Sequence, residues 1–90
     1  MRDDEFEWDD AKAKRNFRDH GITFEQAKAA FGDPDCIDED DPDPNEERLS
    51  RLCRLDQQVF VVVYRERGDR VRIISARLAT KHEQHTYFQQ

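Results

Sequence analysis

The sequence predicts an α+β fold, in which helices pack on an antiparallel sheet, and two observations carry this prediction. Two dense runs of β-branched and aromatic residues, Val59–Tyr64 and Val71–Ala76, lie on either side of a Gly68-Asp69 turn signal. Three helix-start signals lie outside these runs, two in the first third of the chain and one near residue 80. Strands joined by short turns pair antiparallel, so helices and sheet segregate as they do in α+β proteins.

The first two elements are a short strand and a helix. Phe6-Glu7-Trp8 alternates apolar and polar residues, which is typical of an edge strand. Asp9 is a good N-cap for a helix over Asp10–His20, and Gly21 supplies the left-handed residue at which such a helix ends. The predicted inward stripe of this helix consists of Ala13, Phe17 and His20. We expect Trp8 to pack against this helix or the sheet.

A second helix follows directly. Thr23-Phe24-Glu25-Gln26 is a capping box, because the Gln stands three residues after the Thr. The helix should run to about Phe31, where Gly32-Asp33-Pro34 ends it, since Pro removes a donor and restricts the residue before it. Its predicted buried residues are Phe24, Ala27, Ala30 and Phe31.

Residues 33–45 form an acidic stretch, in which positions 33–44 hold seven carboxylates and three prolines. The central Gly and the ligand spacing of a calcium loop are missing, so we expect no metal there. We predict an exposed strand around Cys36–Glu39, followed by a mobile acidic loop.

Three strands and a helix complete the chain. We predict strands over 47–55, 59–67 and 70–77, joined by short turns. Thr80 and Glu83 form another capping box, which opens a helix through about Phe88. The predicted order is β-α-α-β-β-β-β-α, with the helices on one face of the sheet. A length of 90 residues allows a single domain, over 1–90.

Composition excludes several classes of protein. No apolar stretch approaches the ~20 residues that span a bilayer, so we expect no membrane contact. The acidic N-terminus lacks the apolar core of a signal peptide, and two cysteines are too few for a disulfide framework. We therefore expect a cytoplasmic protein, in which Cys36 and Cys53 separately fill small apolar niches.

Charge is distributed unevenly along the chain. Residues 1–45 carry six basic and fifteen acidic groups, whereas residues 46–90 carry nine basic and six acidic groups. Eight of those nine basic residues are arginine, whose forked guanidinium suits phosphate. The net charge of −6 argues against indiscriminate nucleic-acid binding, but a local arginine surface can still bind a phosphate chain. A solvated, salt-bridged surface is the alternative.

The predicted hairpin gathers four of these arginines. A two-residue turn makes Arg67 face Arg70 and Arg65 face Arg72, all on one face of the sheet. Like charges directly opposite one another destabilise a sheet. We therefore expect an anion at this surface, such as RNA phosphate or an acidic partner. An uninterrupted ladder puts Arg77 on the other face, whereas a one-residue bulge reverses that assignment, so the position of Arg77 stays open.

The histidines give weaker signals. His20 stands at the end of a helix, where an imidazole is more often a structural cap than a catalytic group. His82 and His85 lie three positions apart on the last helix, but no carboxylate–Cys set completes a metal site. No nucleophile triad, phosphate loop or dinucleotide motif occurs, so we expect neither a metal nor a cofactor.

A series of motifs, taken in order, resembles the BrnT family of toxins. The opening motifs are Phe6-Glu7-Trp8-Asp9 with Lys12, Asn16 with His20-Gly21, and Phe24-Glu25 with Ala27. The middle motifs are Glu46-Glu47-Arg48 and Val63-Tyr64-Arg65-Glu66-Arg67-Gly68. The closing motif is Arg72-Ile73-Ile74-Ser75-Ala76-Arg77, followed by Ala79-Thr80, Glu83 and Tyr87. The resemblance covers roughly residues 6–88.

This resemblance implies the toxin of a type II toxin–antitoxin pair, with a RelE-like fold and metal-independent endoribonuclease activity. The implied partner is a BrnA-like antitoxin of the ribbon-helix-helix class. It would neutralise the toxin in a hetero-oligomer, with two copies of each chain as one option, and repress the shared operon. Contact with DNA would then be indirect, through the antitoxin. The alternative is an interaction module of weak or lost activity that binds the antitoxin and modulates its DNA binding.

In such a ribonuclease the 2′-hydroxyl of RNA attacks the adjacent phosphorus, so the protein must move protons and stabilise a dianion. Arg67 and Arg77 are our candidates for holding the phosphate. The candidates for proton transfer are Lys12, His20, Glu66 and Tyr87, the last of which could also stack on a base. Further candidates for binding RNA or the antitoxin are Arg48, Arg65, Arg70, Arg72 and Lys81.

Overall fold

The computed structural model describes residues 1–40 and 48–90 of the chain. The elements in these residues are β1 (Phe6–Glu7), α1 (Asp10–His20), α2 (Phe24–Phe31), β2 (Ile37–Asp40), β3 (Leu49–Leu55), β4 (Gln58–Arg67), β5 (Arg70–Leu78) and α3 (Lys81–Phe88). The predicted α+β class and order of elements are confirmed. Positions 41–47, which make up much of the predicted mobile loop, lie outside the described residues.

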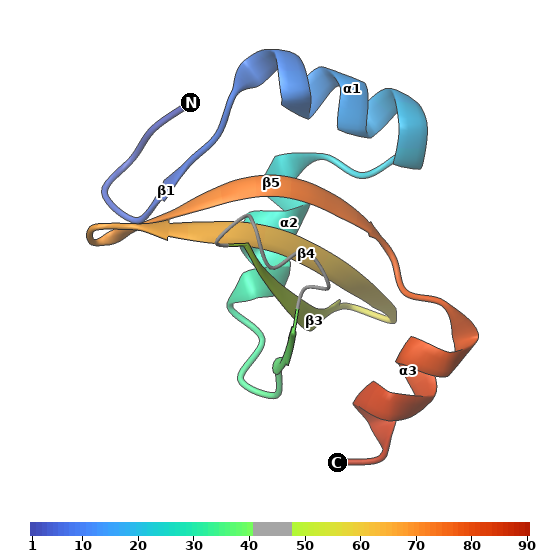
Figure 1. Ribbon diagram of the computed structural model, residues 1–90. Coiled ribbons are helices and arrows are strands. Elements are labelled where there is room, and N and C mark those ends of the chain that lie inside the picture. Colours follow the sequence, from blue (N-terminus) through green and yellow to red (C-terminus); the bar gives the residue numbers. More distant parts are fainter. Residues whose placement is uncertain (41–47) are drawn as a thin grey trace.

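The strands form one sheet in the order β1-β5-β4-β3-β2 (Figure 1). Strands β2 to β5 pair antiparallel, as predicted, whereas β1 joins the edge of β5 in parallel, with Phe6 opposite Val71 and Glu7 opposite Arg72. The sheet is therefore mixed rather than purely antiparallel. A parallel neighbour needs a long connection, and here that connection contains both N-terminal helices and three strands.

The predicted capping groups fix the helix ends. The Oδ1 atom of Asp9 accepts a hydrogen bond from the backbone N–H of Lys12 at 3.0 Å, and Gly21 ends α1 with a φ of 71°. Both predicted capping boxes are present, at the starts of α2 and α3. These local signals explain why α1 begins and ends at the predicted residues.

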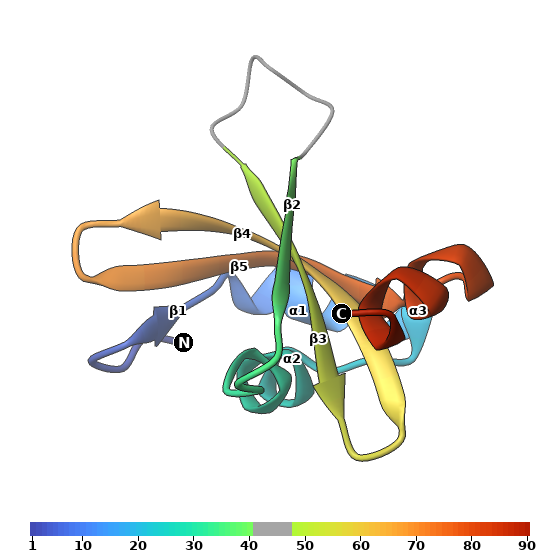
Figure 2. The same ribbon diagram turned by 90° about the horizontal axis from the view of Figure 1, so that it is seen from below.

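Both faces of the sheet bury apolar side chains. One core lies between the sheet and helices α1 and α2 and includes the buried rings of Phe24 and Phe60. The other core consists of Leu52, Val59, Val61, Ala79 and Tyr87, with Ile37 packed against it. Helix α3 thus covers the opposite face, apart from α1 and α2 (Figure 2), and the prediction that all helices share one face is wrong. The continuous apolar run Val59–Val62 of β4 must be covered on both faces of the sheet, and α3 covers the face that α1 and α2 leave open.

Helix α1 faces the sheet through Asn16, which is 6% exposed. Phe17 is 56% exposed and His20 is exposed, so of the predicted inward stripe only Ala13 packs against the core. The prediction fails because α1 lies along the edge of β5 (Figure 1), where backbone polar groups need a polar partner. An amide side chain meets that need, and an apolar stripe does not.

Trp8 is buried, as predicted, and its ring lies edge-on to that of Phe24, with ring centroids 5.7 Å apart. Three of the four residues predicted to be buried in α2 have no exposed surface, namely Phe24, Ala27 and Ala30. Phe31 is half-buried and packs edge-on against Tyr64. The ring of Phe6 in β1 also lies edge-on to Phe31, so aromatic rings from β1, Trp8, α2 and β4 hold the larger core together.

A bulge interrupts the β4–β5 ladder at Ile74. Val63 pairs with Ser75 but Tyr64 pairs with Ile73, which leaves Ile74 without a partner across the ladder. One extra residue reverses the facing of the strand beyond it. Arg77, which pairs with Val61, therefore lies on the same face as the hairpin arginines.

Candidate functional site

Arg54 lies on the face of the sheet opposite α2 and packs on Phe88 of α3. Six other arginines lie on this face, and we call the surface that they form the arginine face. Its members are Arg48, Arg65, Arg67, Arg70, Arg72 and Arg77. The predicted cross-strand pairs, Arg67 with Arg70 and Arg65 with Arg72, are confirmed by the register. Two cross-strand pairs of arginines therefore lie next to each other beside the hairpin turn. Helix α3 covers the other end of the same face.

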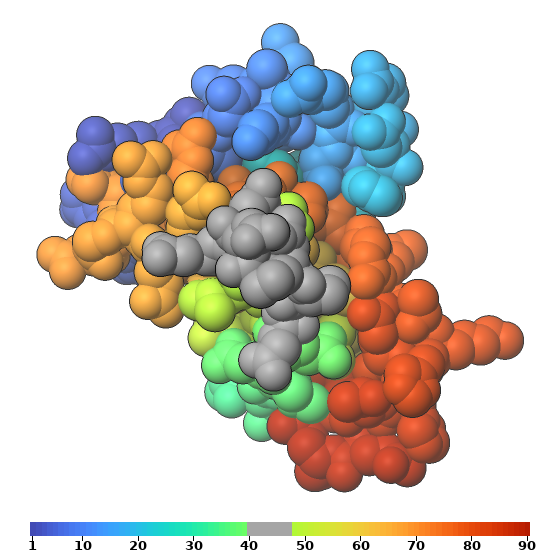
Figure 3. Space-filling view, in the orientation of Figure 1, coloured from blue at the N-terminus to red at the C-terminus, as the bar shows by residue number. Residues whose placement is uncertain are grey.

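A hollow of about 270 Å³ lies between α1 and these strands, and its lining residues are Lys12, Arg48, Arg65, Arg72 and Ile74. Four cationic side chains thus converge on one open space, which favours an anion with several charges. The Nε atom of Arg65 is buried and has no hydrogen-bond partner among residues 1–40 and 48–90. Figure 3 shows α1, in blue, above the orange hairpin on this side of the molecule.

A second hollow of about 270 Å³ continues along α1 and shares Lys12 and Ile74 with the first. Its other lining residues are Arg15, Asn16, Asp19, His20 and Ser75. Lys12, Asn16 and His20 stand four positions apart and therefore lie on one stripe of the helix. Together the two hollows form a groove from the hairpin arginines to the end of α1, which we call the α1 groove.

The carboxylate of Glu7 lies among the guanidiniums. Its Oε2 atom accepts a hydrogen bond from Nη1 of Arg72 at 2.8 Å and lies 3.6 Å from Nη1 of Arg67. Burial alone would raise the pKa of Glu7, but the hydrogen bond from Arg72 and the charges of both arginines outweigh it, so the pKa is lowered. Glu7 is therefore ionised at neutral pH. Arg70 instead donates its Nε–H to the backbone oxygen of Asp3 at 2.8 Å.

Arg77 reaches the same face from beyond the bulge and is held by α3. Its Nη1 and Nη2 atoms donate to the two carboxylate oxygens of Glu83, at 2.8 and 3.0 Å. This forked pair lowers the pKa of Glu83 to about 2 and raises that of Arg77. The side chain of Arg77 is still 43% exposed, so a ligand can reach it.

Three of the predicted site residues belong neither to the α1 groove nor to the arginine face. Tyr87 is buried, and its hydroxyl donates to Oδ2 of Asp33 at 2.5 Å; burial and then this hydrogen bond raise the pKa of Tyr87 well above its usual range. Glu66 pairs with Val71 and lies on the opposite face from the arginines. Lys81 is exposed at the start of α3. The roles assigned to these three residues stay predictions.

The two cysteines lie together. Sγ of Cys36 is 2.9 Å from Sγ of Cys53, because the pairing of Ile37 with Leu52 brings these flanking residues face to face. Burial raises the pKa of both thiols, which are therefore protonated at neutral pH. The prediction of two separate niches is wrong, since the positions lie 17 apart in sequence and nothing in that spacing reveals the strand pairing.

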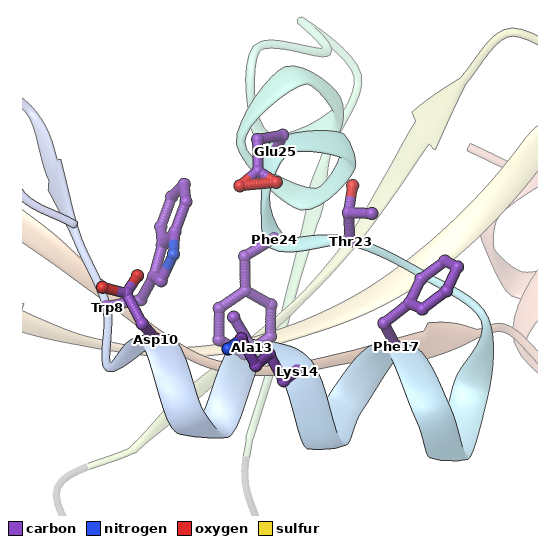
Figure 4. A pocket seen from close by; sticks show the side chains of 8 residues that line it. All are labelled: Trp8, Asp10, Ala13, Lys14, Phe17, Thr23, Phe24 and Glu25. Carbon is purple, nitrogen blue, oxygen red and sulfur yellow. The ribbon is translucent and has the colours of Figure 1, made fainter.

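A larger hollow, of about 600 Å³, lies between α1 and α2 (Figure 4). Trp8 and Phe17 stand at its two ends, and the ring of Phe24 lies between them. Its charged lining residues are Asp10, Lys14 and Glu25. No candidate for RNA chemistry lines this hollow, and its charges are of both signs, so it lacks the concentration of cations found in the α1 groove.

Within residues 1–40 and 48–90, no three His, Cys, Asp or Glu side chains come together in the manner of a metal site. None of the helices in these ranges combines the length and apolar character needed to cross a membrane.

The fold and the α1 groove define a small α+β protein with a cationic surface suited to a chain of phosphates. The family described as "Ribonuclease toxin, BrnT, of type II toxin-antitoxin system" matches residues 8–83, and the chain belongs to this family. The resemblance seen in the motifs is confirmed. The family consists of ribonuclease toxins, and its type II class implies an antitoxin partner. No curated protein matches the chain.

Sequence reasoning gave no role to two residues that organise the site. Glu7 was visible as the polar residue of a short strand and as part of the opening family motif, but its partner Arg72 is 65 positions away. Asn16 is a polar residue in a helix interior, four positions from both Lys12 and His20. That spacing was the one signal that could have identified it as the inward-facing residue of α1.

Proposed function

We propose that this chain is a metal-independent endoribonuclease that binds RNA in the α1 groove and on the arginine face. The observation that carries the proposal is the convergence of Lys12, Arg65 and Arg72 on one hollow, beside a buried Arg65 Nε atom that has no partner in the described residues. A phosphate oxygen is the acceptor that such an atom needs. The family description supplies the class of substrate.

The chemistry requires a nucleophile that RNA itself provides. Its 2′-hydroxyl loses a proton and attacks the adjacent phosphorus, the bond from that phosphorus to the 5′-oxygen of the next nucleotide breaks, and this oxygen takes up a proton. Guanidiniums stabilise the charge that develops on the phosphoryl oxygens. Arg65 and Arg72 line the groove, and Arg67 and Arg77 extend the same face on either side. Arginine side chains can supply this charge stabilisation without a metal ion.

Proton transfer falls to the side chains of the α1 groove. Lys12 lines the groove where its two hollows meet, His20 lines it at the end of α1, and an imidazole can accept or donate a proton near neutral pH. The hydroxyl of Tyr87 is engaged by Asp33, and Glu66 faces away. We therefore favour Lys12 and His20 over these two as the acid and base.

The antitoxin is a second ligand for the same surface. We propose a BrnA-like protein of the ribbon-helix-helix class that covers the arginine face with acidic groups and represses the shared operon together with the toxin. Charge complementarity supports this, because the exposed guanidiniums would steer an acidic segment as readily as RNA. Contact with DNA would pass through the antitoxin alone, and the toxin would act in the cytoplasm, where its RNA substrate lies.

RNA cleavage by the purified chain, freed of antitoxin, tests the proposal. We expect cleavage in excess EDTA, a product that ends in a cyclic phosphate, and no cleavage where the attacking 2′-hydroxyl is replaced by hydrogen. Arg72→Ala should lower turnover by ~10²–10³-fold, because it removes a charge-stabilising donor. Arg18→Ala is the matched control, since Arg18 is exposed and bonds only to its neighbour Asp19 among the described residues.

The other candidate function, an inactive module that binds only the antitoxin, predicts a different result. Wild-type protein would then leave RNA intact under all conditions, while Arg67→Ala and Arg77→Ala would weaken antitoxin binding and its salt dependence. If all variants cleave RNA at the wild-type rate, the arginine face is not the catalytic surface.

A further inference from the structure

The side chain of Glu7 enters the arginine face through the parallel pairing of β1. Glu7 stands opposite Arg72 in the register, so both side chains project from the same face of the sheet. The Glu7 side chain is 14% exposed, the lowest of the three side chains in this cluster, since those of Arg72 and Arg67 are 29% and 56% exposed. A carboxylate thus lies beneath two guanidiniums that are more open to solvent.

This carboxylate fixes two long side chains by contact. The 2.8 Å hydrogen bond from Nη1 of Arg72 and the 3.6 Å approach of Nη1 of Arg67 meet at the same oxygen, Oε2. Arginine side chains have many rotamers, so an unpaired guanidinium on a surface samples many positions. Two contacts that share one oxygen bring the guanidiniums of Arg72 and Arg67 side by side.

The hairpin makes such a constraint necessary. Arg72 pairs directly with Arg65, and Arg67 with Arg70, so without a counter-charge each pair would separate by repulsion. Glu7 offsets part of that repulsion and leaves donors for a ligand. A guanidinium has five N–H groups, and the bond to Glu7 engages only Nη1 of Arg72, so its Nε and Nη2 atoms can still bind a phosphate in a forked arrangement.

We propose that Glu7 is a positioning residue for RNA cleavage, which holds the guanidiniums of Arg72 and Arg67 in the arrangement that receives the reacting phosphate. This inference rests on the proposed ribonuclease function. Glu7 acts through the two arginines and does not itself contact RNA. Its effect should therefore appear in turnover, because displacing a charge-stabilising group from its place weakens transition-state binding.

The test compares Glu7→Gln with Glu5→Gln. At position 7, glutamine keeps the size of the side chain and one acceptor oxygen but removes the charge. Glu5 serves as the control because it is exposed, lies two positions away, and its carboxylate has no ion pair in the described residues. With a fluorogenic RNA oligonucleotide, Glu7→Gln should lower kcat by about 10–100-fold while KM changes less than threefold. Glu5→Gln should match the wild type. Equal kcat values for the two variants would overturn the proposal.

A double-variant cycle separates positioning from a merely structural role. In an Arg67→Ala/Arg72→Ala background Glu7 has nothing left to position, so adding Glu7→Gln should not lower kcat further. If Glu7 served only the fold, its substitution would lower the activity of that background by the same factor as in the wild type. That additive result would also overturn the proposal.

A second measurement does not depend on catalysis. The Nε–Hε NMR signal of Arg72 should be sharp in the wild type and in Glu5→Gln but broadened in Glu7→Gln, as the guanidinium becomes mobile. If wild-type protein cleaves no RNA, the proposed function fails, and this signal still decides whether Glu7 holds Arg72. An Arg72 signal that is identical in all three proteins would contradict the positioning role.

Discussion

The side-chain amide of Asn16 forms two hydrogen bonds with the backbone of Ala76, which lies 60 positions further along the chain. Its Nδ2 donates to the Ala76 oxygen at 2.9 Å, and its Oδ1 accepts from the Ala76 nitrogen at 3.1 Å. The strand β1 pairs with β5 only at Val71 and Arg72, so within residues 1–40 and 48–90 no strand lies beside this edge of β5 at Ala76. Asn16 supplies there the donor and acceptor of a missing peptide group, and so fixes α1, with Lys12 and His20, along the groove.

Replacing Asn16 with Leu should therefore destabilise the domain strongly. The substitution removes three hydrogen bonds, including one from Nδ2 to the oxygen of Ile22, and leaves buried backbone groups unpaired. We expect a loss of about 3–4 kcal/mol in the free energy of unfolding, measured by urea denaturation. Lys14→Ala, at an exposed position of the same helix, should change it by less than about 0.5 kcal/mol. Similar values for the two variants would show that the amide is dispensable.

The local parts of this fold could be predicted from sequence because their causes are local. The N-cap Asp9, the left-handed Gly21 and the two capping boxes each act within four residues, and each gave the correct helix end. The two-residue turn likewise set the pairing of Arg67 with Arg70. The cationic hairpin could therefore be predicted from the sequence alone.

The features of the fold and site that could not be predicted depend on contacts between residues that are distant in sequence. Ile74 is one β-branched residue in a run of similar ones, so nothing marks it as the extra residue of a bulge, yet it decides the facing of Arg77. The same holds for Glu7 and Arg72, which meet only because β1 pairs in parallel. The side on which α3 packs follows from the two-sided burial of β4; the apolar run Val59–Val62 indicates that both faces are covered, but not which helix covers which face.

Truncating Trp8 should cost far more than truncating Phe17, although both rings line the hollow between α1 and α2 (Figure 4). Trp8 is 4% exposed and packs on Phe24, whereas Phe17 is 56% exposed. Trp8→Ala should lower the free energy of unfolding by about 3–5 kcal/mol. Phe17→Ala should lower it by less than about 1 kcal/mol. Thermal melts followed by circular dichroism compare the two directly, and equal melting temperatures would contradict the assigned burial.

Two glycines provide a test of backbone conformation with a matched control. Gly21 has a φ of 71°, and a Cβ there would meet nothing within 4 Å, so any cost of Gly21→Ala comes from the backbone alone. We expect a loss of about 1 kcal/mol. Gly32 has a φ of −80°, which alanine adopts freely, and its Cβ would lie 3.4 Å from the oxygen of Ala29. Gly32→Ala should thus be neutral or slightly stabilising. The opposite ranking in chemical denaturation would exclude the left-handed cap at Gly21.

The forked pair between Arg77 and Glu83 should make part of the stability depend on pH. The pKa of Glu83 is about 2 in the folded chain against an ordinary 4.5, so its contribution is present above pH 4.5 and is lost as the pH falls toward 2. Glu83→Gln keeps an N3 side chain that can complete the capping box, as Gln26 does in α2, but it carries no charge. At neutral pH the variant should be less stable by about 1 kcal/mol, because solvent partly screens the pair.

That difference should shrink steadily below pH 4.5, and the two proteins should become equally stable near pH 2. Urea denaturation at several pH values measures it. Other carboxylates with lowered pKa values, such as Asp3 and Asp33, contribute to the acid sensitivity of both proteins and cancel in the comparison. Glu25→Gln, at the exposed first turn of α2, is the control and should follow the wild type throughout. If the difference in the free energy of unfolding between Glu83→Gln and wild type stays constant from neutral to acidic pH, the lost stability comes from the cap rather than from the ion pair.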